Sequence, residues 1–258
     1  MRQSAADSRL SPAERFMPVI SLVIPAYNEA ALLPRLLDTI DIARDRFNGG
    51  RDAIEVIVAD NGSTDDTATI AAARGCRVAR VTARMIGASR NGGAALATAP
   101  ILCFTDADMQ VHPDTFNAIA LAMTNPRVAG GATGVTMERW SGGIALTFAM
   151  LLPLVWLTGM DTGVVFMRRT DFEHIGGYSE TRHFAEDVDF LFKLIRLVRS
   201  RGEHVTRLRP VKAIASVRKF DRYGDWHYFW MMPRLALGTL IPSKSKHPTA
   251  RRYWYDDR

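Results

Sequence analysis

Short β-rich runs alternate with longer helical stretches between residues 19 and 108. The predicted strands lie over residues 19–26, 54–59, 77–82 and 101–105. Strands that alternate with helices in this way are typical of repeated βαβ units, whose strands align in parallel. The chain is therefore predicted to be an α/β protein with a mainly parallel central sheet flanked by helices.

Local signals place the helices between these strands. Pro34 can take the first position of the first helix, because its missing N–H has no partner there in any case. Ser63 and Asp66 have the spacing of a capping box, and Gly75 would end the helix that follows. A third helix, made mostly of small residues, is expected over 88–97.

Composition limits the class of protein. The chain has 258 residues, of which 47% are hydrophobic and 23% charged, which is typical of a globular protein with one large or two small domains. Cys76 and Cys103 lack metal-ligand spacing and predict no disulfide framework, which fits the cytoplasm. The net charge of +6 is not gathered in one stripe, so no nucleic-acid partner is predicted. Residues 1–17 read as a flexible leader rather than a targeting segment.

Polar residues follow the predicted strands at the edge where α/β sheets bind ligands. Tyr27 and Glu29 follow the first strand, and Asp60 and Asn61 follow the second. An aromatic ring can pack on a nucleobase, and a carboxylate can accept hydrogen bonds from its edge. Each residue also has an ordinary use in a turn or helix cap. Together they predict a nucleotide site.

An acidic pair, Asp106 and Asp108, follows the apolar run 101–105. In an extended segment the two carboxylates would lie on the same side and share one hard cation. Mg²⁺ or Mn²⁺ held by only two carboxylates keeps positions open for phosphate oxygens. The tripeptide alone is common and would equally suit a solvated acidic turn. With its surroundings, it predicts a metal site for a phosphorylated substrate.

Two nucleotide-binding classes are disfavoured by the glycines. Gly87 and Gly92 have the spacing of a phosphate-binding P-loop, but Gly93 and Ala94 stand where Lys and Ser or Thr are required. An ATPase is therefore disfavoured. A Gly-x-Gly-x-x-Gly sequence does not follow the first strand, which argues against a dinucleotide-dependent dehydrogenase.

Four strings occur in the order and spacing of the landmarks of a known family. They are SLVIPAYNE, VIVADNGSTDDT, SRNGGAA followed by LCFTDAD, and IGGYSE followed by AEDVDF. Over residues 19–197 the chain resembles the family 2 glycosyltransferases. The resemblance implies the GT-A type nucleotide-diphospho-sugar transferase fold, an inverting hexosyltransferase and a nucleotide-diphosphate donor, with UDP-sugar favoured.

The resemblance also implies a donor site. It assigns Asp60 to the nucleobase, Asp106 to ribose or metal, and Asp108 to direct coordination of a metal that bridges the donor diphosphate. Arg90 stands at a position that can bind phosphate, and Arg84 competes for that role. The other implied donor-binding residues are Pro25, Ala26, Tyr27, Glu29 and Ala107.

Glu186 and Asp187 match the Glu-Asp landmark of the same family. The resemblance implies that Asp187 is the general base, which takes the proton of the acceptor hydroxyl, and that Glu186 either supports it or binds the acceptor. Asp189 is a less favoured substitute. The same acids suit the first turn of a helix through its dipole, and both roles are compatible. Asp161 could contact sugar hydroxyls, although a turn before a strand is slightly favoured.

The last part of the chain is basic and aromatic. Arg218 and Arg222 are expected to hold the leaving diphosphate, or else to lie in a solvated basic loop. The Gln-x-x-Arg-Trp motif of processive synthases is absent, which argues against polymer synthesis. The segment 226–240 and the cations after it suit an anionic membrane surface or a second subunit. A lipid-linked acceptor at the inner face of the membrane is therefore an option.

The uncharged stretch 141–160 is nearly long enough to span a bilayer. A spanning helix is rejected, because Pro153 interrupts the stretch and it lies between two halves of one predicted site. The predicted division is a leader over 1–17, a catalytic domain over 18–215 and a closing or docking segment over 216–258. The alternatives are a sugar-phosphate nucleotidyltransferase and a noncatalytic nucleotide-sugar-binding or membrane scaffold protein.

Overall fold

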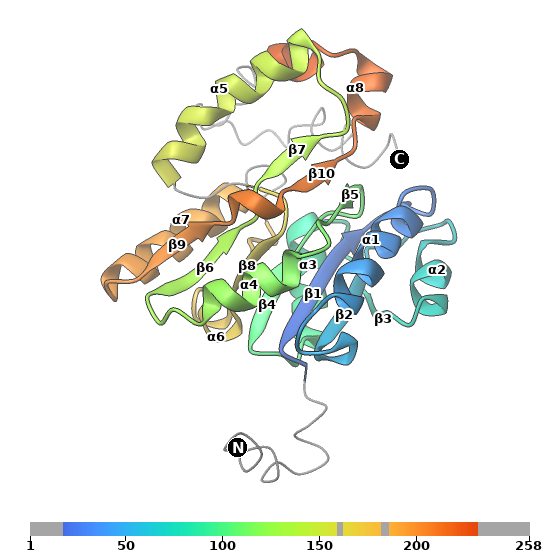
Figure 1. The fold of residues 1–258 in the computed structure, drawn as a ribbon. Coiled ribbons are helices and arrows are strands. Elements are labelled where there is room, and N and C mark those ends of the chain that lie inside the picture. Colours follow the sequence, from blue (N-terminus) through green and yellow to red (C-terminus); the bar gives the residue numbers. More distant parts are fainter. Residues whose placement is uncertain (1–17, 159–161, 182–185, 232–258) are drawn as a thin grey trace, which may run out of the picture.

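A computed structural model describes residues 18–158, 162–181 and 186–231 (Figure 1). Its main sheet has seven strands in the order β3-β2-β1-β4-β8-β6-β9. The first four in that order run parallel, as do β6 and β9, whereas β8 is antiparallel to both of its neighbours. The predicted α/β class with a mainly parallel sheet is confirmed.

The helices and strands follow each other along the chain in a regular order. They are β1 (Ile20–Ala26), α1 (Leu33–Asp45), η2 (Arg51–Ala53), β2 (Ile54–Asp60), α2 (Thr67–Ala73), β3 (Arg77–Arg80), α3 (Ile86–Leu96), β4 (Ile101–Phe104), β5 (Met109–Gln110), α4 (Thr115–Met123), β6 (Val128–Ala132), β7 (Val135–Met137), α5 (Gly142–Thr158), β8 (Val165–Arg168), α6 (Arg169–His174), α7 (Glu186–Ser200), β9 (His204–Arg207), η3 (Arg209–Val211), β10 (Ala213–Ala215) and α8 (Arg218–Tyr223).

Alternation along the strands divides the core between the two faces of the sheet. Ile20, Leu22 and Ile24 of β1 pack on one face of the sheet with α1 and α4. Val23 of the same strand packs on the other face with α3, α6 and α7. Burying one such side chain stabilises the fold by about 1.5–3 kcal/mol. The period of two in the sequence therefore fixes which helices cover which face.

A small second sheet, in the order β5-β10-β7, lies beyond the carboxyl ends of the parallel strands (Figure 1). Helices α5 and α8 lie beyond it, on the side away from the start of β1. The segment between β6 and β8 leaves the main sheet and contains β7 and α5. Strands β6 and β8 pair with each other. The two ends of the segment are joined, because Thr133 N donates to Val164 O at 3.1 Å and Val164 N donates to Thr133 Oγ1 at 3.0 Å.

Two local predictions were wrong. Helix α2 begins at Thr67, and Ser63 does not cap it, because the Ser63 hydroxyl accepts a hydrogen bond from Asn28 N at 3.0 Å instead. The third strand ends at Arg80 and does not reach residue 82.

In the part of the chain that the structure describes, no helix has the length and apolarity needed to cross a membrane. The predicted leader lies outside the described residues, as does Asp161.

Candidate active site

The loops after β1 and β2 are tied to each other. Asn28 adopts a left-handed backbone conformation with φ of 52°, which Asn tolerates better than most residues. Its side-chain Oδ1 accepts a hydrogen bond from Thr64 N at 2.8 Å, and its own N–H binds Ser63. These reciprocal bonds hold the residues that follow Ala26 beside those that follow Asp60.

Asp60 and Asn61 are both buried at the end of β2. Asp60 Oδ1 accepts a hydrogen bond from Ser63 N at 3.1 Å, and Asn61 N donates to Ala26 O at 2.8 Å. Pro25 and Ala26 are buried strand residues whose register partners are Ala59 and Asp60. The sheet therefore places the predicted nucleobase carboxylate next to the end of the first landmark.

Tyr27 directly follows β1, and its ring contacts Arg84. The guanidinium carbon of Arg84 lies 5.6 Å from the centre of the Tyr27 ring, within the range of a cation–π contact. Tyr27 is half-buried and follows β1, whereas Arg84 precedes α3. An aromatic ring from the loop after β1 and a positive charge from the loop before α3 therefore lie side by side.

Asp106 and Asp108 lie in a turn rather than in an extended run. Strand β4 ends at Phe104, and Met109 N donates to Asp106 O at 3.2 Å. The extended geometry expected from the sequence was wrong, because this backbone bond bends the chain before β5. Ala107 is buried, and both carboxylates are partly exposed. They face different cations, Asp106 the guanidinium of Arg90 and Asp108 that of Arg218.

Arg90 of α3 lies at the centre of the acidic residues. Its Nη2 donates to Asp106 Oδ1 at 3.1 Å, and its Nη1 donates to Glu186 Oε1 at 3.3 Å and to Asp187 Oδ1. The Arg90 side chain is only 7% exposed. A guanidinium is rarely buried unless carboxylates compensate its charge. Arg90 thus joins the predicted metal site to the predicted base.

Glu186 and Asp187 begin α7 but differ in exposure. The Glu186 side chain is buried, and this burial raises its pKa to about 7, with a further contribution from the charge of Asp187. The Asp187 side chain is 59% exposed. Both carboxylates lie beside Arg90, but the Glu186 side chain is buried whereas that of Asp187 is open to solvent.

Arg218 connects α8 to the end of β1. Its two terminal nitrogens donate to the two oxygens of Glu29, each at 3.0 Å, and Nη2 lies 4.0 Å from Asp108 Oδ2. Glu29 is 1% exposed, and its N–H donates to Thr67 Oγ1 at 2.8 Å. Arg222 lies on the same helix, with its guanidinium 5.5 Å from the ring centre of Tyr223.

The donor set suits a divalent cation that also binds a substrate. Asp106 and Asp108 offer carboxylate oxygens, the ligands that Mg²⁺ and Mn²⁺ prefer. Among the residues described, no three or more His, Cys, Asp or Glu side chains gather closely enough to form a complete metal cage. A cation held here would take its remaining ligands from phosphate oxygens or water.

Sequence reasoning missed two residues beside this site. Tyr178 lies under Arg90, with the guanidinium carbon 4.9 Å from its ring centre. Asn91 hydrogen-bonds the backbone of Tyr178 through both ends of its amide. The string IGGYSE and the Arg90-Asn91 pair marked both positions in the sequence, but their relation depends on the packing of α3 against the loop after α6.

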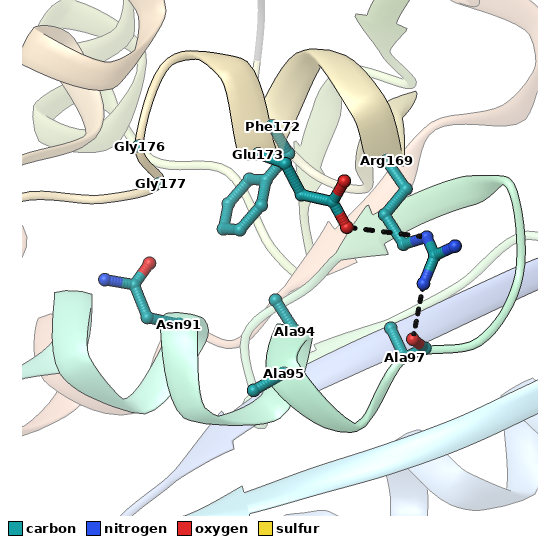
Figure 2. A pocket seen from close by; sticks show the side chains of 9 residues that line it. All are labelled: Asn91, Ala94, Ala95, Ala97, Arg169, Phe172, Glu173, Gly176 and Gly177. Carbon is teal, nitrogen blue, oxygen red and sulfur yellow. Dashed lines mark hydrogen bonds and ion pairs between the residues drawn. The ribbon is translucent and has the colours of Figure 1, made fainter.

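A pocket of about 330 Å³ lies between α3 and α6 (Figure 2). Its residues are Asn91, Ala94, Ala95, Ala97, Arg169, Phe172, Glu173, Gly176 and Gly177. None of the predicted site residues lines it. Asn91, however, belongs both to this pocket and to the surroundings of Tyr178.

The fold is that of the GT-A class of glycosyltransferases. Residues 21–176 match the family model described as Glycosyl transferase family 2. The chain belongs to this family, as the sequence motifs predicted.

Curated relatives support the assignment. Validoxylamine A glucosyltransferase of Streptomyces hygroscopicus subsp. jinggangensis is 36% identical over 123 residues, which are 45% of this chain; the match spans only 28% of the length of that protein. A PGL/p-HBAD biosynthesis glycosyltransferase of Mycobacterium bovis (strain BCG / Pasteur) is 29% identical over 215 residues, which cover 79% of this chain and 78% of the relative.

Solved structures show the same fold. Glucosyl-3-phosphoglycerate synthase of Mycobacterium tuberculosis, in complex with Mn²⁺, UDP and glucosyl-3-phosphoglycerate, gives a TM-score of 0.60 at 20% identity, with 92% of this chain and 86% of that chain covered. A mannosyltransferase of Pyrobaculum calidifontis, in complex with GDP-Man and Mn²⁺, gives a TM-score of 0.61 at 21% identity, with 78% and 58% covered.

Proposed function

We propose that the protein is an inverting, divalent-metal-dependent glycosyltransferase. It would move one sugar from a nucleotide-diphosphate donor, UDP-sugar in first place, to a hydroxyl group of an acceptor. The observation that carries this proposal is the placement of Asp106 and Asp187 on the two terminal nitrogens of one guanidinium, that of Arg90. Donor-side and acceptor-side carboxylates that are distant in sequence thereby share one site.

The donor would bind at the carboxyl ends of β1, β2 and β4. Asp60 would accept a hydrogen bond from the nucleobase and Tyr27 would pack against it, with the end of β1 closing the pocket. Neighbouring structures support a nucleotide-sugar donor, since TarS of S. aureus was solved with UDP-GlcNAc and the mannosyltransferase with GDP-Man. The uridine preference rests on the family resemblance.

A divalent cation, Mg²⁺ or Mn²⁺, would be held by Asp108 and Asp106. When bound, it would neutralise the charge of the departing diphosphate. Arg218, Arg222 and Arg84 would add positive charge around the same leaving group. Arg90 would contribute by holding Asp106 in place, because its guanidinium is already paired with carboxylates.

Asp187 would act as the general base. A sugar hydroxyl is a weak nucleophile, so a carboxylate that takes its proton during attack on the anomeric carbon lowers the barrier. The exposed side chain of Asp187 can reach such a hydroxyl, and its position in the first turn of α7 holds it rigidly. A single displacement of this kind inverts the anomeric centre.

We also propose that the protein contacts a membrane surface. Large apolar side chains are exposed on and around α5 and after α8, namely Trp140, Leu146, Leu152, Trp226 and Trp230. Such side chains beside cations favour a lipid surface, here the inner face of the membrane, and a lipid-linked acceptor would fit. A second copy of the chain is the competing partner. Residues 216–231 would belong to this docking or closing segment, whose remainder, 232–258, lies outside the described residues.

The proposed function is tested by incubating the protein with UDP-Glc, UDP-GlcNAc and GDP-Man in the presence of Mn²⁺ and a panel of hydroxyl acceptors. We expect release of nucleoside diphosphate together with a glycosylated product whose anomeric configuration, read by NMR, is opposite to that of the donor. Retained configuration would overturn the inverting mechanism. Undiminished transfer after chelation would overturn the metal requirement.

A further inference from the structure

We propose that Asn91 and Tyr178 are positioning residues for the transfer. Asn91 would fix the main chain of Tyr178, and the Tyr178 ring would fix the Arg90 guanidinium between Asp106 and Asp187. This inference rests on the proposed function, because it gives Asp187 the role of base. It assigns a task to two residues that contact none of the reacting groups themselves.

The first step is the hydrogen bonding of Asn91 to the loop after α6. Asn91 Oδ1 accepts a hydrogen bond from Tyr178 N at 2.9 Å, and Asn91 Nδ2 donates to Tyr178 O at 2.9 Å. Nδ2 also donates to Glu180 Oε1 at 2.8 Å. Figure 2 shows the Asn91 side chain on the side of α3 that faces the Gly176–Gly177 turn. One amide therefore replaces the backbone partners that a strand or helix would supply at this position.

The second step is the contact of the Tyr178 ring with the two elements that carry the acids. The ring stacks on Phe190 of α7, with centres 4.1 Å apart and an interplanar angle of 16°. It meets Phe104, the last residue of β4, edge-on at 5.3 Å. Asp187 begins α7, and Asp106 follows β4. A single buried ring thus sets the spacing between the two carboxylate-bearing elements.

The third step is the need of Arg90 for a support. Among the residues that the structure describes, the carboxylates engage its terminal nitrogens, and no group accepts a hydrogen bond from the buried Nε. The guanidinium carbon lies over the Tyr178 ring, 4.9 Å from its centre. A flat cation on an aromatic face gains attraction and loses freedom to rotate. Without the ring, the hydrogen bonds to Asp106 and Asp187 would no longer be held in one orientation.

The chain contains a matched control for this arrangement. Asn117 of α4 also binds backbone through both ends of its amide, since its Nδ2 donates to Arg46 O at 2.8 Å and its Oδ1 accepts from Asn48 N at 3.0 Å. These contacts join α4 to the end of α1, away from the acids. Asn117→Ala removes the same kind of clamp as Asn91→Ala without touching Tyr178.

The test compares the wild type with the variants Asn91→Ala, Asn117→Ala, Tyr178→Phe and Tyr178→Leu. Each is assayed as the full chain with Mn²⁺ and whichever of UDP-Glc, UDP-GlcNAc and GDP-Man supports transfer. Displacement of a catalytic group by about 1 Å can lower the rate by about 100-fold. We expect Asn91→Ala and Tyr178→Leu to lower kcat by about 10- to 100-fold while the donor KM changes less than about threefold. Tyr178→Phe keeps the ring and should retain kcat, as should Asn117→Ala.

A second readout does not depend on turnover. The Nε–Hε signal of Arg90 in a ¹⁵N–¹H spectrum, assigned by its loss in Arg90→Lys, should be sharp in the wild type, Tyr178→Phe and Asn117→Ala. It should broaden in Asn91→Ala and Tyr178→Leu. Equal kcat for the two asparagine variants, or an unchanged Arg90 signal in Tyr178→Leu, would overturn the inference. Absence of transfer in the wild type would count against the proposed function, and the spectra would still decide the positioning.

Discussion

Arg218 and Glu29 form a bidentate ion pair between α8 and the end of β1, with both nitrogen–oxygen distances at 3.0 Å. The two residues come from opposite ends of the described chain. Glu29 is almost fully buried, so the pairing with Arg218 offsets part of the cost of burying its carboxylate. The pair ties the C-terminal part of the site to the loop proposed to bind the nucleoside.

Replacing Arg218 by Ala should therefore destabilise the fold strongly. Removing one member of a buried ion pair costs about 3 kcal/mol or more. The free energy of unfolding, measured with urea, should fall by this order. Adding Glu29→Gln to the variant should restore part of the loss, because the side chain that lost the guanidinium is then neutral. Arg139→Ala is the control, since its solvent-exposed ion pairs with Asp221 and Asp225 should contribute little to stability.

The pKa of Glu186 predicts a dependence of stability on pH. Burial raises this pKa from 4.5 to about 7, so between these values the folded state holds a proton that the unfolded state has released. The contribution of Glu186 to stability is present below pH 4.5 and is lost as the pH rises through 7. Urea unfolding across this range should show the wild type losing stability relative to Glu186→Gln. A constant difference between the two proteins would contradict the raised pKa.

Asp187→Asn should remove the base while leaving the donor site intact. We expect kcat to fall by about 100- to 10,000-fold, the usual contribution of general base catalysis. Binding of UDP with Mn²⁺, measured by calorimetry, should stay close to that of the wild type. Asp189→Asn changes an acid two residues along the same helix, whose side chain pairs with Lys193 at 3.0 Å, and should retain most of the activity. Full turnover in Asp187→Asn would remove the assignment.

Asp108→Asn should weaken the proposed cation site. A ligand that binds only the folded state raises the melting temperature, so a donor nucleotide should stabilise the wild type more with Mn²⁺ than with a chelator. This difference should shrink or vanish in Asp108→Asn. Asp114→Asn serves as the control, because it alters a partly exposed acid that pairs with Arg46 at 3.1 Å. A full Mn²⁺-dependent shift in Asp108→Asn would argue against coordination by this residue.

Neighbouring glycines offer a steric test of the Asn91 clamp. Gly176 and Gly177 have φ of 78° and 68°, so alanine is strained at both positions by about 1–2 kcal/mol. A Cβ at Gly177 would also lie 2.6 Å from Asn91 Oδ1, whereas one at Gly176 would meet no atom within 4 Å. Thermal unfolding should show Gly177→Ala to be the less stable variant. Equal melting temperatures would mean that the Asn91 side chain moves aside without loss of stability.

The sequence predicted the parallel strands and their helices because one signal, the period of apolar residues, governs both local structure and packing. Pro34 indeed stands near the start of α1, and Gly75 follows α2 with a positive φ. The turn after Asp106 could not be predicted in the same way. It depends on a single backbone bond to Met109, which leaves no periodic pattern.

The candidate site shows the same division. Its acids and Arg90 stand in motifs that can be recognised one at a time, so the sequence named them. The role of Tyr178 depends on three aromatic and cationic neighbours contributed by α3, β4 and α7. Such a relationship appears only when the elements have packed. Ser63 illustrates the reverse case, since a spacing typical of a cap instead serves a bond to Asn28.

The pairing of β6 with β8 has an evolutionary consequence. Thr133 and Val164 are hydrogen-bonded to each other, so everything between them starts and finishes at one point of the sheet. A replacement of different length or polarity could be spliced in there without changing the register of the flanking strands. The main sheet can thus stay unchanged while the segment between β6 and β8 varies in sequence and length.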